Sequence, residues 1–272
     1  MTEPVFPPLL QRQRAVVTGA SSGIGEAVAR GLAAAGASVI VNWRSGQEEA
    51  ERIVQEITDA GGCAHAVQAD ISVPEECRRL FARAADLLGG LDLLVANAGI
   101  QRDASFADMA LEDWRKVLDV NLTGQFLCAQ EALRCFRRQG PQPDRSRALG
   151  KIIFISSVHQ HIPWAGHANY AASKGGLHML MASLAQEVAC EGVRVNAIAP
   201  GAIATDINRS AWEGEEARAA LLQRIPYARV GAPQDIAQAA VWLGSDLADY
   251  VVGTTLVVDG GMSLYPFFRE GG

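Results

Sequence analysis

The sequence predicts an α/β fold in which helices cover both faces of a doubly wound, seven-stranded parallel sheet. Short apolar, β-branched runs alternate along the chain with longer amphipathic stretches, which is the pattern of βαβ units. A glycine-rich turn separates the first apolar run from the first helical stretch. With 272 residues, 49% of them hydrophobic, the chain can bury one large core, so we expect a single domain over residues 1–272.

The expected elements follow from these patterns in order. Apolar runs predict strands at residues 15–18, 38–41, 64–68, 91–96, 151–155, 194–198 and 255–258. Helical periodicity predicts helices at 25–35, 47–60, 74–88, 111–138, 171–190 and 233–243. The proline- and glycine-containing stretch 140–150 predicts a surface loop, and 206–228 predicts a mobile pair of helices over a site.

Charge and composition narrow the function classes. A net charge of −6 and a pI near 5.4, with no basic cluster, argue against nucleic-acid or membrane partners and favour a small-molecule substrate. No apolar run approaches the ~18 residues of a membrane span, and residues 1–14 lack the apolar core of a secretory signal. Five cysteines without CxxC spacing indicate neither a disulfide framework nor a zinc site, so we expect a cytoplasmic protein without a metal.

The turn from Thr18 to Gly25 predicts a dinucleotide site. Glycines at its start, middle and end allow a tight turn and bring backbone N–H groups close to a pyrophosphate at the following helix N-terminus. The alternative is a purely structural turn. The turn residues expected to contact the cofactor are Gly19, Ser21, Ser22, Gly23, Ile24 and Gly25.

The end of the second strand predicts the cofactor's identity. Trp43 stands where an NAD enzyme usually carries a carboxylate for the ribose 2′-hydroxyl. Arg44 follows it and can bind a 2′-phosphate, which favours NADP. The alternative is a solvated arginine beside a packing tryptophan. NAD is the alternative cofactor.

Three other strand ends supply small or polar residues suited to the same cofactor. Asp70 and Ile71 would meet its adenine end, and the small residues after the fourth strand leave room for it. Asn97 can instead simply cap a turn. The backbone amides after the sixth strand, with Thr205, would bind a carboxamide. The residues after the fourth and sixth strands are Asn97, Ala98, Gly99, Pro200, Gly201, Ile203 and Thr205.

Residues 151–176 contain the predicted catalytic group. Tyr170 and Lys174 are four apart on a predicted helix, so both side chains share one face, and a nearby ammonium favours the phenolate. Ser157 at the preceding strand end can hydrogen-bond the same substrate oxygen. Asn121 is a polar residue inside a periodic helix, where it can loosen the helix and hold a water. A surface tyrosine with an unrelated lysine is the alternative.

In order and approximate spacing, these motifs resemble the short-chain dehydrogenase/reductase family over nearly the whole chain. The resemblance implies a Rossmann domain that transfers hydride between NAD(P) and an alcohol or carbonyl. It also implies that Tyr170 is the general acid/base, that Lys174 lowers its pKa and holds the nicotinamide ribose, that Ser157 orients the substrate and that Asn121 holds a relay water. A homotetramer is expected, with helices 111–138 and 171–190 and the tail from Leu264 to Phe268 at its interfaces.

Several segments are further similar to bacterial glucose 1-dehydrogenases, among them 157–164, 170–176 and 259–266. This implies oxidation of β-D-glucose or a similar aldose at C1 to the lactone. Gln101 and His159 are the predicted sugar-binding residues, because both offer hydrogen-bonding groups near Ser157. The alternatives are a 3-oxoacyl thioester or general ketone reductase and, more remotely, a non-catalytic dinucleotide sensor. His159 and His161 without a third ligand do not indicate a metal site.

Overall fold

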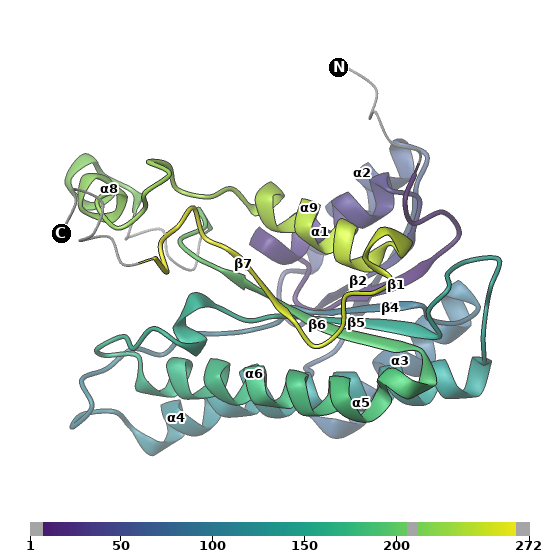
Figure 1. Cartoon of the computed structure of the whole chain (residues 1–272), viewed down its shortest axis with the longest axis horizontal. Helices are drawn as coiled ribbons and strands as arrows, with labels where there is room; N and C mark the ends of the chain where they lie inside the picture. Colours follow the sequence, from purple (N-terminus) through teal and green to yellow (C-terminus); the bar gives the residue numbers. More distant parts are fainter. Residues whose placement is uncertain (1–7, 206–211, 265–272) are drawn as a thin grey trace.

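The computed structural model describes residues 8–205 and 212–264. Its seven strands form one parallel sheet in the order β3-β2-β1-β4-β5-β6-β7, which confirms the predicted fold class (Figure 1). The strands are β1 (Arg14–Val17), β2 (Ser38–Trp43), β3 (Cys63–Gln68), β4 (Leu93–Ala96), β5 (Gly150–Ile155), β6 (Val193–Pro200) and β7 (Thr255–Val258). The order reverses between β1 and β4, and ligands of open α/β sheets bind at the strand ends beside such a reversal.

Helices cover the sheet in two layers, with α1, α2 and α9 on one face and α3, α4, α5 and α6 on the other (Figure 1). The helices are α1 (Gly23–Ala34), α2 (Gln47–Asp59), α3 (Pro74–Leu88), α4 (Leu111–Leu118), α5 (Gln125–Gln139), α6 (Ala168–Val188), α8 (Glu215–Leu222) and α9 (Pro233–Gly244). None of the helices in the described ranges is long and apolar enough to cross a membrane.

The two cores follow directly from the alternation of side chains along a strand. In β1, Val17 packs toward α1 and α9, whereas Val16 packs toward α3 and α5. All four residues of β1 are buried, because helices cover both faces of a parallel sheet. The resulting continuous apolar runs are the feature that made the strands recognisable in the sequence.

Two predicted helices differ from the observed ones. The expected helix 111–138 is interrupted by a π-helical segment, Asp119–Gly124, between α4 and α5. The expected helix 171–190 begins earlier, at Ala168. Of the predicted helix pair at 206–228, α8 is present, and residues 206–211 lie outside the described residues. π-Helical turns are frequent at functional sites, and this one contains Asn121.

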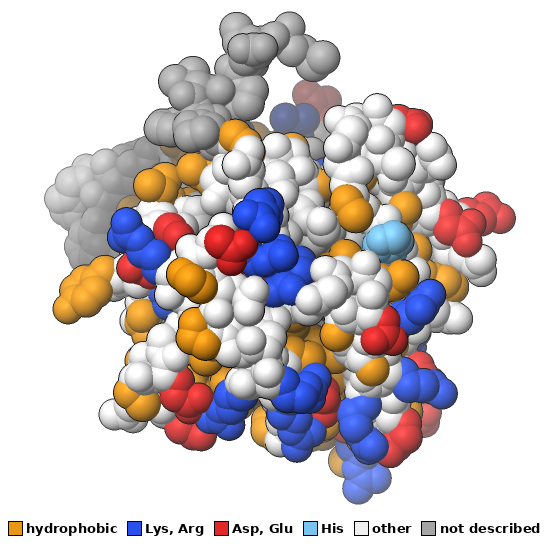
Figure 2. Space-filling model, turned by 90° about the vertical axis from the view of Figure 1, so that its right-hand side faces the viewer, with side chains coloured by type: hydrophobic (Ala, Val, Ile, Leu, Met, Phe, Trp, Pro, Cys, Tyr) orange, Lys and Arg blue, Asp and Glu red, His pale blue; other side chains and the backbone are white. Residues whose placement is uncertain are grey.

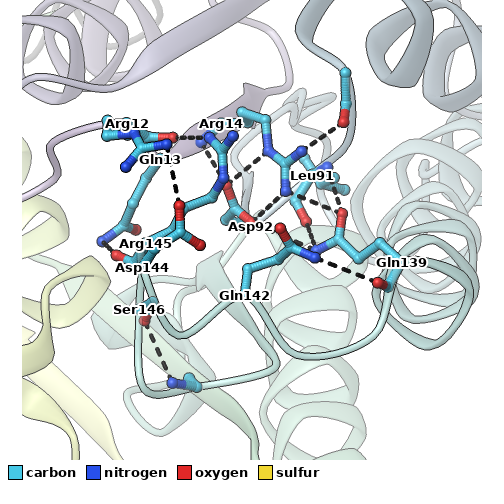
Figure 3. A network of polar contacts seen from close by, with 12 residues as sticks. Arg12, Gln13, Arg14, Leu91, Asp92, Gln139, Gln142, Asp144, Arg145 and Ser146 are labelled. Carbon is cyan, nitrogen blue, oxygen red and sulfur yellow. Dashed lines mark hydrogen bonds and ion pairs between the residues drawn. The ribbon is translucent and has the colours of Figure 1, made fainter.

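A buried polar network joins the start of β1 to the start of β4 and to the end of α5 (Figure 3). Asp92 accepts hydrogen bonds from the Arg14 guanidinium at 2.8 and 2.7 Å, and Gln139 bonds the backbone of Leu91. Arg145, from the loop between α5 and β5, donates to the Arg12 carbonyl. The predicted 140–150 loop is therefore tied to the N-terminal segment, at the right-hand end of Figure 1.

The surface at this end carries acidic and basic side chains close together. Figure 2 shows Lys and Arg side chains interspersed with Asp and Glu on the face seen from the right of Figure 1. The network contributes exposed pairs to this region, such as Arg12 with Asp144 at 3.1 Å. Exposed pairs of this kind add little stability because solvent screens them.

Candidate active site

A cleft of about 790 Å³ lies along the carboxyl ends of the central strands. The glycine turn after β1 forms one wall. A Cβ at Gly25 would lie 2.3 Å from the Gly19 carbonyl oxygen and 2.5 Å from Asn97 Nδ2, so only glycine fits there. Gly19 has φ +60°, a conformation that favours glycine, and a Cβ there would meet Ala98. All six predicted turn residues line the cleft.

Side-chain hydrogen bonds hold the glycine turn in place. Asn97 Nδ2 donates to the carbonyls of Thr18 and Gly19 at 2.9 and 3.1 Å. Thr18 Oγ1 in turn accepts from the backbone amides of Asn97 and Ala98. Asn42 Oδ1 accepts from the Gly19 amide at 3.2 Å. The turn is thus fixed from two neighbouring strands, and this tight α1 N-terminus fits a dinucleotide pyrophosphate.

Of the two cofactor residues predicted at the end of β2, only Arg44 lines the cleft. Arg44 lines the cleft, is half exposed, and lies 3.7 Å from Asp70. Burial alone would raise the pKa of the Asp70 carboxyl, but hydrogen bonds from Ser72 and the charges of Lys116 and Arg44 bring that pKa below its usual value. Trp43 is buried in the core layer of α1 and α2 and does not line the cleft.

The turn after β6 uses part of its backbone within the fold. Pro200, Gly201, Ile203 and Thr205 all line the cleft. The Gly201 amide, however, donates to Val258 and the Ala204 amide to Gly231. These two amides are therefore already hydrogen-bonded within the protein. The predicted carboxamide contact would have to be made by the other groups of the turn.

Ser157, Tyr170 and Lys174 come together on the wall opposite the glycine turn. Ser157 lies two residues after the end of β5, and α6 carries Tyr170 and Lys174 one turn apart. Lys174 is 3% exposed, donates to the Ile155 carbonyl at 2.8 Å, and lies 5.6 Å from the centroid of the Tyr170 ring. The predicted shared helix face is observed, and the carbonyl of β5 fixes the ammonium beside the phenol.

Burial shifts the pKa values of both Tyr170 and Lys174. Burial raises the pKa of the Tyr170 phenol above its usual value, and hydrogen bonds from Ser157 and Gln101 act against that rise. Burial also lowers the pKa of Lys174 to about 8. Ser157 and Gln101 thus act to lower the pKa of Tyr170, and the same role for Lys174 stays a prediction.

Asn121 is fully buried in the π-helical segment. Its Oδ1 accepts from the Ile100 amide at 2.8 Å, and its Nδ2 donates to the Ile100 carbonyl and to Ser173 Oγ. The side chain therefore ties the loop after β4 to α6. A relay water held at Asn121 stays a prediction.

The two predicted sugar-binding residues have partners within the protein. Gln101 lines the cleft and acts to lower the pKa of Tyr170. His159 Nδ1 lies 3.0 Å from the Ile162 carbonyl, which makes Nδ1 the protonated nitrogen and leaves Nε2 as an acceptor. Burial lowers the pKa of His159, so the ring is neutral near pH 7.

Comparison with known families supports this interpretation of the site. The match covers most of the chain and includes the glycine turn, Asn97, Ser157, Tyr170 and Lys174. A family described as enoyl-(acyl carrier protein) reductase matches residues 19–263. The chain belongs to the short-chain dehydrogenase/reductase family. It is an NAD(P)-dependent oxidoreductase of that family, and the sequence-based assignment to it is confirmed.

Relatives within the family differ in their printed substrates. The chain is 49% identical over 262 residues to 3beta-hydroxysteroid dehydrogenase 1 of Eggerthella lenta, covering 96% of this chain and 98% of the relative. It is 42% identical to glucose 1-dehydrogenase 2 of Bacillus subtilis, covering 94% and 97%. A gluconate 5-dehydrogenase structure from Burkholderia cenocepacia, in complex with NADP and tartrate, has a TM-score of 0.86 at 35% identity and covers 94% and 97%.

Some cleft residues were not predicted from the sequence. Asn42 points from near the end of β2 to the glycine turn, and its hydrogen bonds to the carbonyls of Val67 and Ala69 explain why a polar residue is tolerated there. Leu221 comes from α8. Others come from loops whose path has no periodic signal, and these include Ile100, Ile162, Pro163, Trp164, Arg224, Met262 and Leu264. Among the described residues, no group of three or more His, Cys, Asp or Glu side chains could hold a metal ion.

Proposed function

We propose that the protein uses NADP to interconvert a secondary alcohol and a ketone on a ring whose body is largely apolar, as in a 3β-hydroxysteroid. The observation that carries the proposal is the single cleft in which the glycine turn faces Ser157, Tyr170 and Lys174. The apolar cleft residues beyond Tyr170, including Ile162, Pro163 and Trp164, support an apolar substrate body. The relative with 49% identity, a 3beta-hydroxysteroid dehydrogenase, also supports it.

The residues of the chain have distinct roles in this reaction. In oxidation, Tyr170 Oη accepts the hydroxyl proton of the substrate, while Ser157 Oγ hydrogen-bonds the same oxygen. Gln101 donates to the phenolate form of Tyr170 that accepts this proton, and so favours that form. Lys174, fixed by the Ile155 carbonyl, offers its charge to the ribose and to the phenolate. When bound, the nicotinamide accepts the hydride from the alcohol carbon or returns it to the carbonyl.

Oxidation of an aldose at C1, with β-D-glucose first, is the second candidate. Gln101 and the acceptor Nε2 of His159 are two polar groups near Tyr170 that a sugar's further hydroxyls can use. The 42% identity to a glucose 1-dehydrogenase supports it as well. We rank the aldose below the ring alcohol, because the cleft wall is apolar and His159 already hydrogen-bonds within the protein.

A substrate panel tests the proposal. Purified enzyme is assayed by nicotinamide absorbance with a 3β-hydroxysteroid, D-glucose, a 3-oxoacyl thioester and an open-chain secondary alcohol, each with NADP(H) and NAD(H). We expect the highest kcat/KM with the 3β-hydroxysteroid and NADP. Faster oxidation of glucose would select the second candidate, and the absence of hydride transfer with every compound would refute the proposed function.

Arg44 is expected to select NADP. Its side chain lines the cleft and is half exposed, so it can turn from Asp70 toward a 2′-phosphate. Arg44→Ala should weaken NADP binding about tenfold, the loss of one charge-assisted hydrogen-bonded contact, and leave NAD binding unchanged. Arg52→Ala is the control, because Arg52 is equally exposed but pairs with Glu56 and Glu26 outside the cleft. Equal losses for both cofactors, or a clear wild-type preference for NAD, would contradict this role.

Lys174 is expected to make cofactor affinity depend on pH. Because burial lowers its pKa to about 8, the ammonium is present below that pH and is lost above it. NADP affinity should therefore fall as pH rises through about 8. Lys174→Met should lower kcat roughly tenfold to a hundredfold, weaken NADP binding and remove the pH step. Fluorescence titration with NADPH from pH 6 to 9.5 measures this, and an unchanged pH step in the variant would exclude Lys174 as its source.

A homotetramer, made by packing α4, α5 and α6 against symmetry mates, remains a proposal, as does a cytoplasmic location. Large apolar side chains exposed on or beside these helices support the assembly, among them Leu111, Phe126 and Met179. The tail after Leu264, also predicted to join an interface, lies outside the described residues. Light scattering at micromolar concentration should give four times the chain mass, and a monomeric mass would refute the assembly.

A further inference from the structure

A stack of three rings forms the part of the cleft wall next to Tyr170. The Trp164 indole lies 3.5 Å from the His167 ring at an interplanar angle of 7°, and 4.3 Å from the His159 ring at 21°, between ring centroids. Two rings that lie nearly parallel and this close to one centroid must occupy opposite faces of the indole. The edge of the His159 ring then approaches Tyr170, with centroids 6.4 Å apart. The stack therefore leads from the protein surface to the catalytic tyrosine.

The outer end of the stack is fixed to another segment of the chain. His167 Nε2 lies 3.2 Å from Asp103 Oδ2, and the His167 side chain is only 15% exposed. Backbone contacts join the same two loops, since the Ala104 amide donates to Gly166 and Asn169 donates to the Arg102 carbonyl. The loop after β4 and the loop after β5 are thereby held together, with the indole fixed between two imidazoles.

Only part of this stack faces the cleft. Trp164 and His159 line it, together with Ile162 and Pro163, whereas His167 and Asp103 do not. Since both indole faces are covered, Trp164 offers the substrate an edge whose position cannot adapt. A fixed wall gains most from a rigid ligand, because a ring loses little conformational freedom on binding and an open chain loses more.

We propose that the stack of His159, Trp164 and His167, held at its outer end by Asp103, is the specificity-determining wall of the substrate site, and that it selects ring alcohols over open-chain alcohols. The inference rests on the proposed function, since it names the substrate shape that the same site accepts. His167 and Asp103 are positioning residues here, because they act on the substrate only through Trp164 and His159.

The test compares two secondary alcohols of equal carbon number, cyclohexanol and 2-hexanol, with saturating NADP. Wild-type enzyme should have the higher kcat/KM for cyclohexanol. His167→Ala removes both the stacked ring and its contact with Asp103, and should reduce this preference about tenfold through KM for cyclohexanol. His167→Phe keeps a flat ring, and Asp103→Asn keeps the stack without the carboxylate. Both should reduce the preference about threefold.

Three controls separate a substrate wall from general damage to the fold. His161→Ala, in the same loop, removes a ring that contacts His178 instead of Trp164, and should leave the preference unchanged. In all His167 and Asp103 variants, kcat for 2-hexanol and the NADPH dissociation constant should stay at the wild-type values. Partial retention of the preference by His167→Phe is an effect that mere loop destabilisation would not give.

A preference that His167→Ala leaves intact, or a loss of activity that is equal for both alcohols, would overturn the inference. A wild-type enzyme without a preference for cyclohexanol, whether both alcohols react equally or neither reacts, would overturn it too. The proposed function is tested separately by the substrate panel, in which faster glucose oxidation or no hydride transfer with any compound would overturn it, so the two failures are distinguishable.

Discussion

Replacing Tyr170 by phenylalanine is expected to lower kcat by about two to four orders of magnitude, the contribution typical of a positioned general acid or base. The change removes a single oxygen and keeps the ring beside Lys174 and His159. Without that oxygen, no group takes the hydroxyl proton of the alcohol while Ser157 holds its oxygen. The NADPH dissociation constant should change little, because the ring still packs and Lys174 keeps its bond to Ile155.

The measurement is single-turnover hydride transfer, followed by nicotinamide absorbance, beside an NADPH fluorescence titration. Tyr250→Phe is the matched control, since Tyr250 is fully exposed and does not line the cleft. Near-normal turnover in Tyr170→Phe would remove Tyr170 from the chemistry. A large loss of NADPH affinity would instead mean that the phenol holds the cofactor more than it moves a proton.

The sheet could be predicted from the sequence because its strands are buried on both faces. Val16 and Val17, adjacent in β1, enter opposite cores, so the strand has no polar side to obscure it. The helix 111–138 was predicted without its interruption, because a π-helical turn keeps nearly the same hydrophobic periodicity as an α-helix. Only the polar Asn121 marked the place, and its bonds to Ile100 and Ser173 are tertiary contacts.

The site was predictable where backbone geometry demands particular residues. Gly19 and Gly25 are forced by close contacts, so the glycine turn is visible in the sequence. Trp43 was not predictable in this way. Adjacent residues of a strand point to opposite faces of the sheet, and the sequence alone did not show that Trp43 points into the core. The roles of Trp164 and His167 depend on a loop after β4 meeting a loop after β5, which no local pattern records.

Two charged residues at strand starts have a role that only the structure shows. Arg14 is the first residue of β1 and Lys151 the second of β5, and both are buried. Burial lowers the pKa of Lys151 to about 8, and its ammonium is bonded to Gln13 and to Ser146. Arg14 and its partner Asp92 are more than seventy residues apart in the chain, so their pairing could not be deduced from sequence spacing.

Replacing Asp92 by alanine is expected to destabilise the protein by about 3–5 kcal/mol, because it leaves the buried Arg14 guanidinium without its carboxylate. Asp92 accepts from the Arg14 amide at 2.9 Å and from Nε and Nη2 at 2.8 and 2.7 Å, and both side chains are about 5% exposed (Figure 3). Gly89 and Gln139 would remain as neutral partners for a charge that only a carboxylate neutralises.

Urea unfolding at pH 7 and one fixed protein concentration measures the loss, since assembly would otherwise change the apparent stability. Asp144→Ala is the control within the same network. Its pair with Arg12 is more than half exposed on both sides, so it should cost about 0–1 kcal/mol. Combining Asp92→Leu with Arg14→Met removes both charges and should recover most of the stability lost in Asp92→Ala. If Asp92→Ala costs no more than Asp144→Ala, the burial of this pair does not contribute to holding β1 against β4.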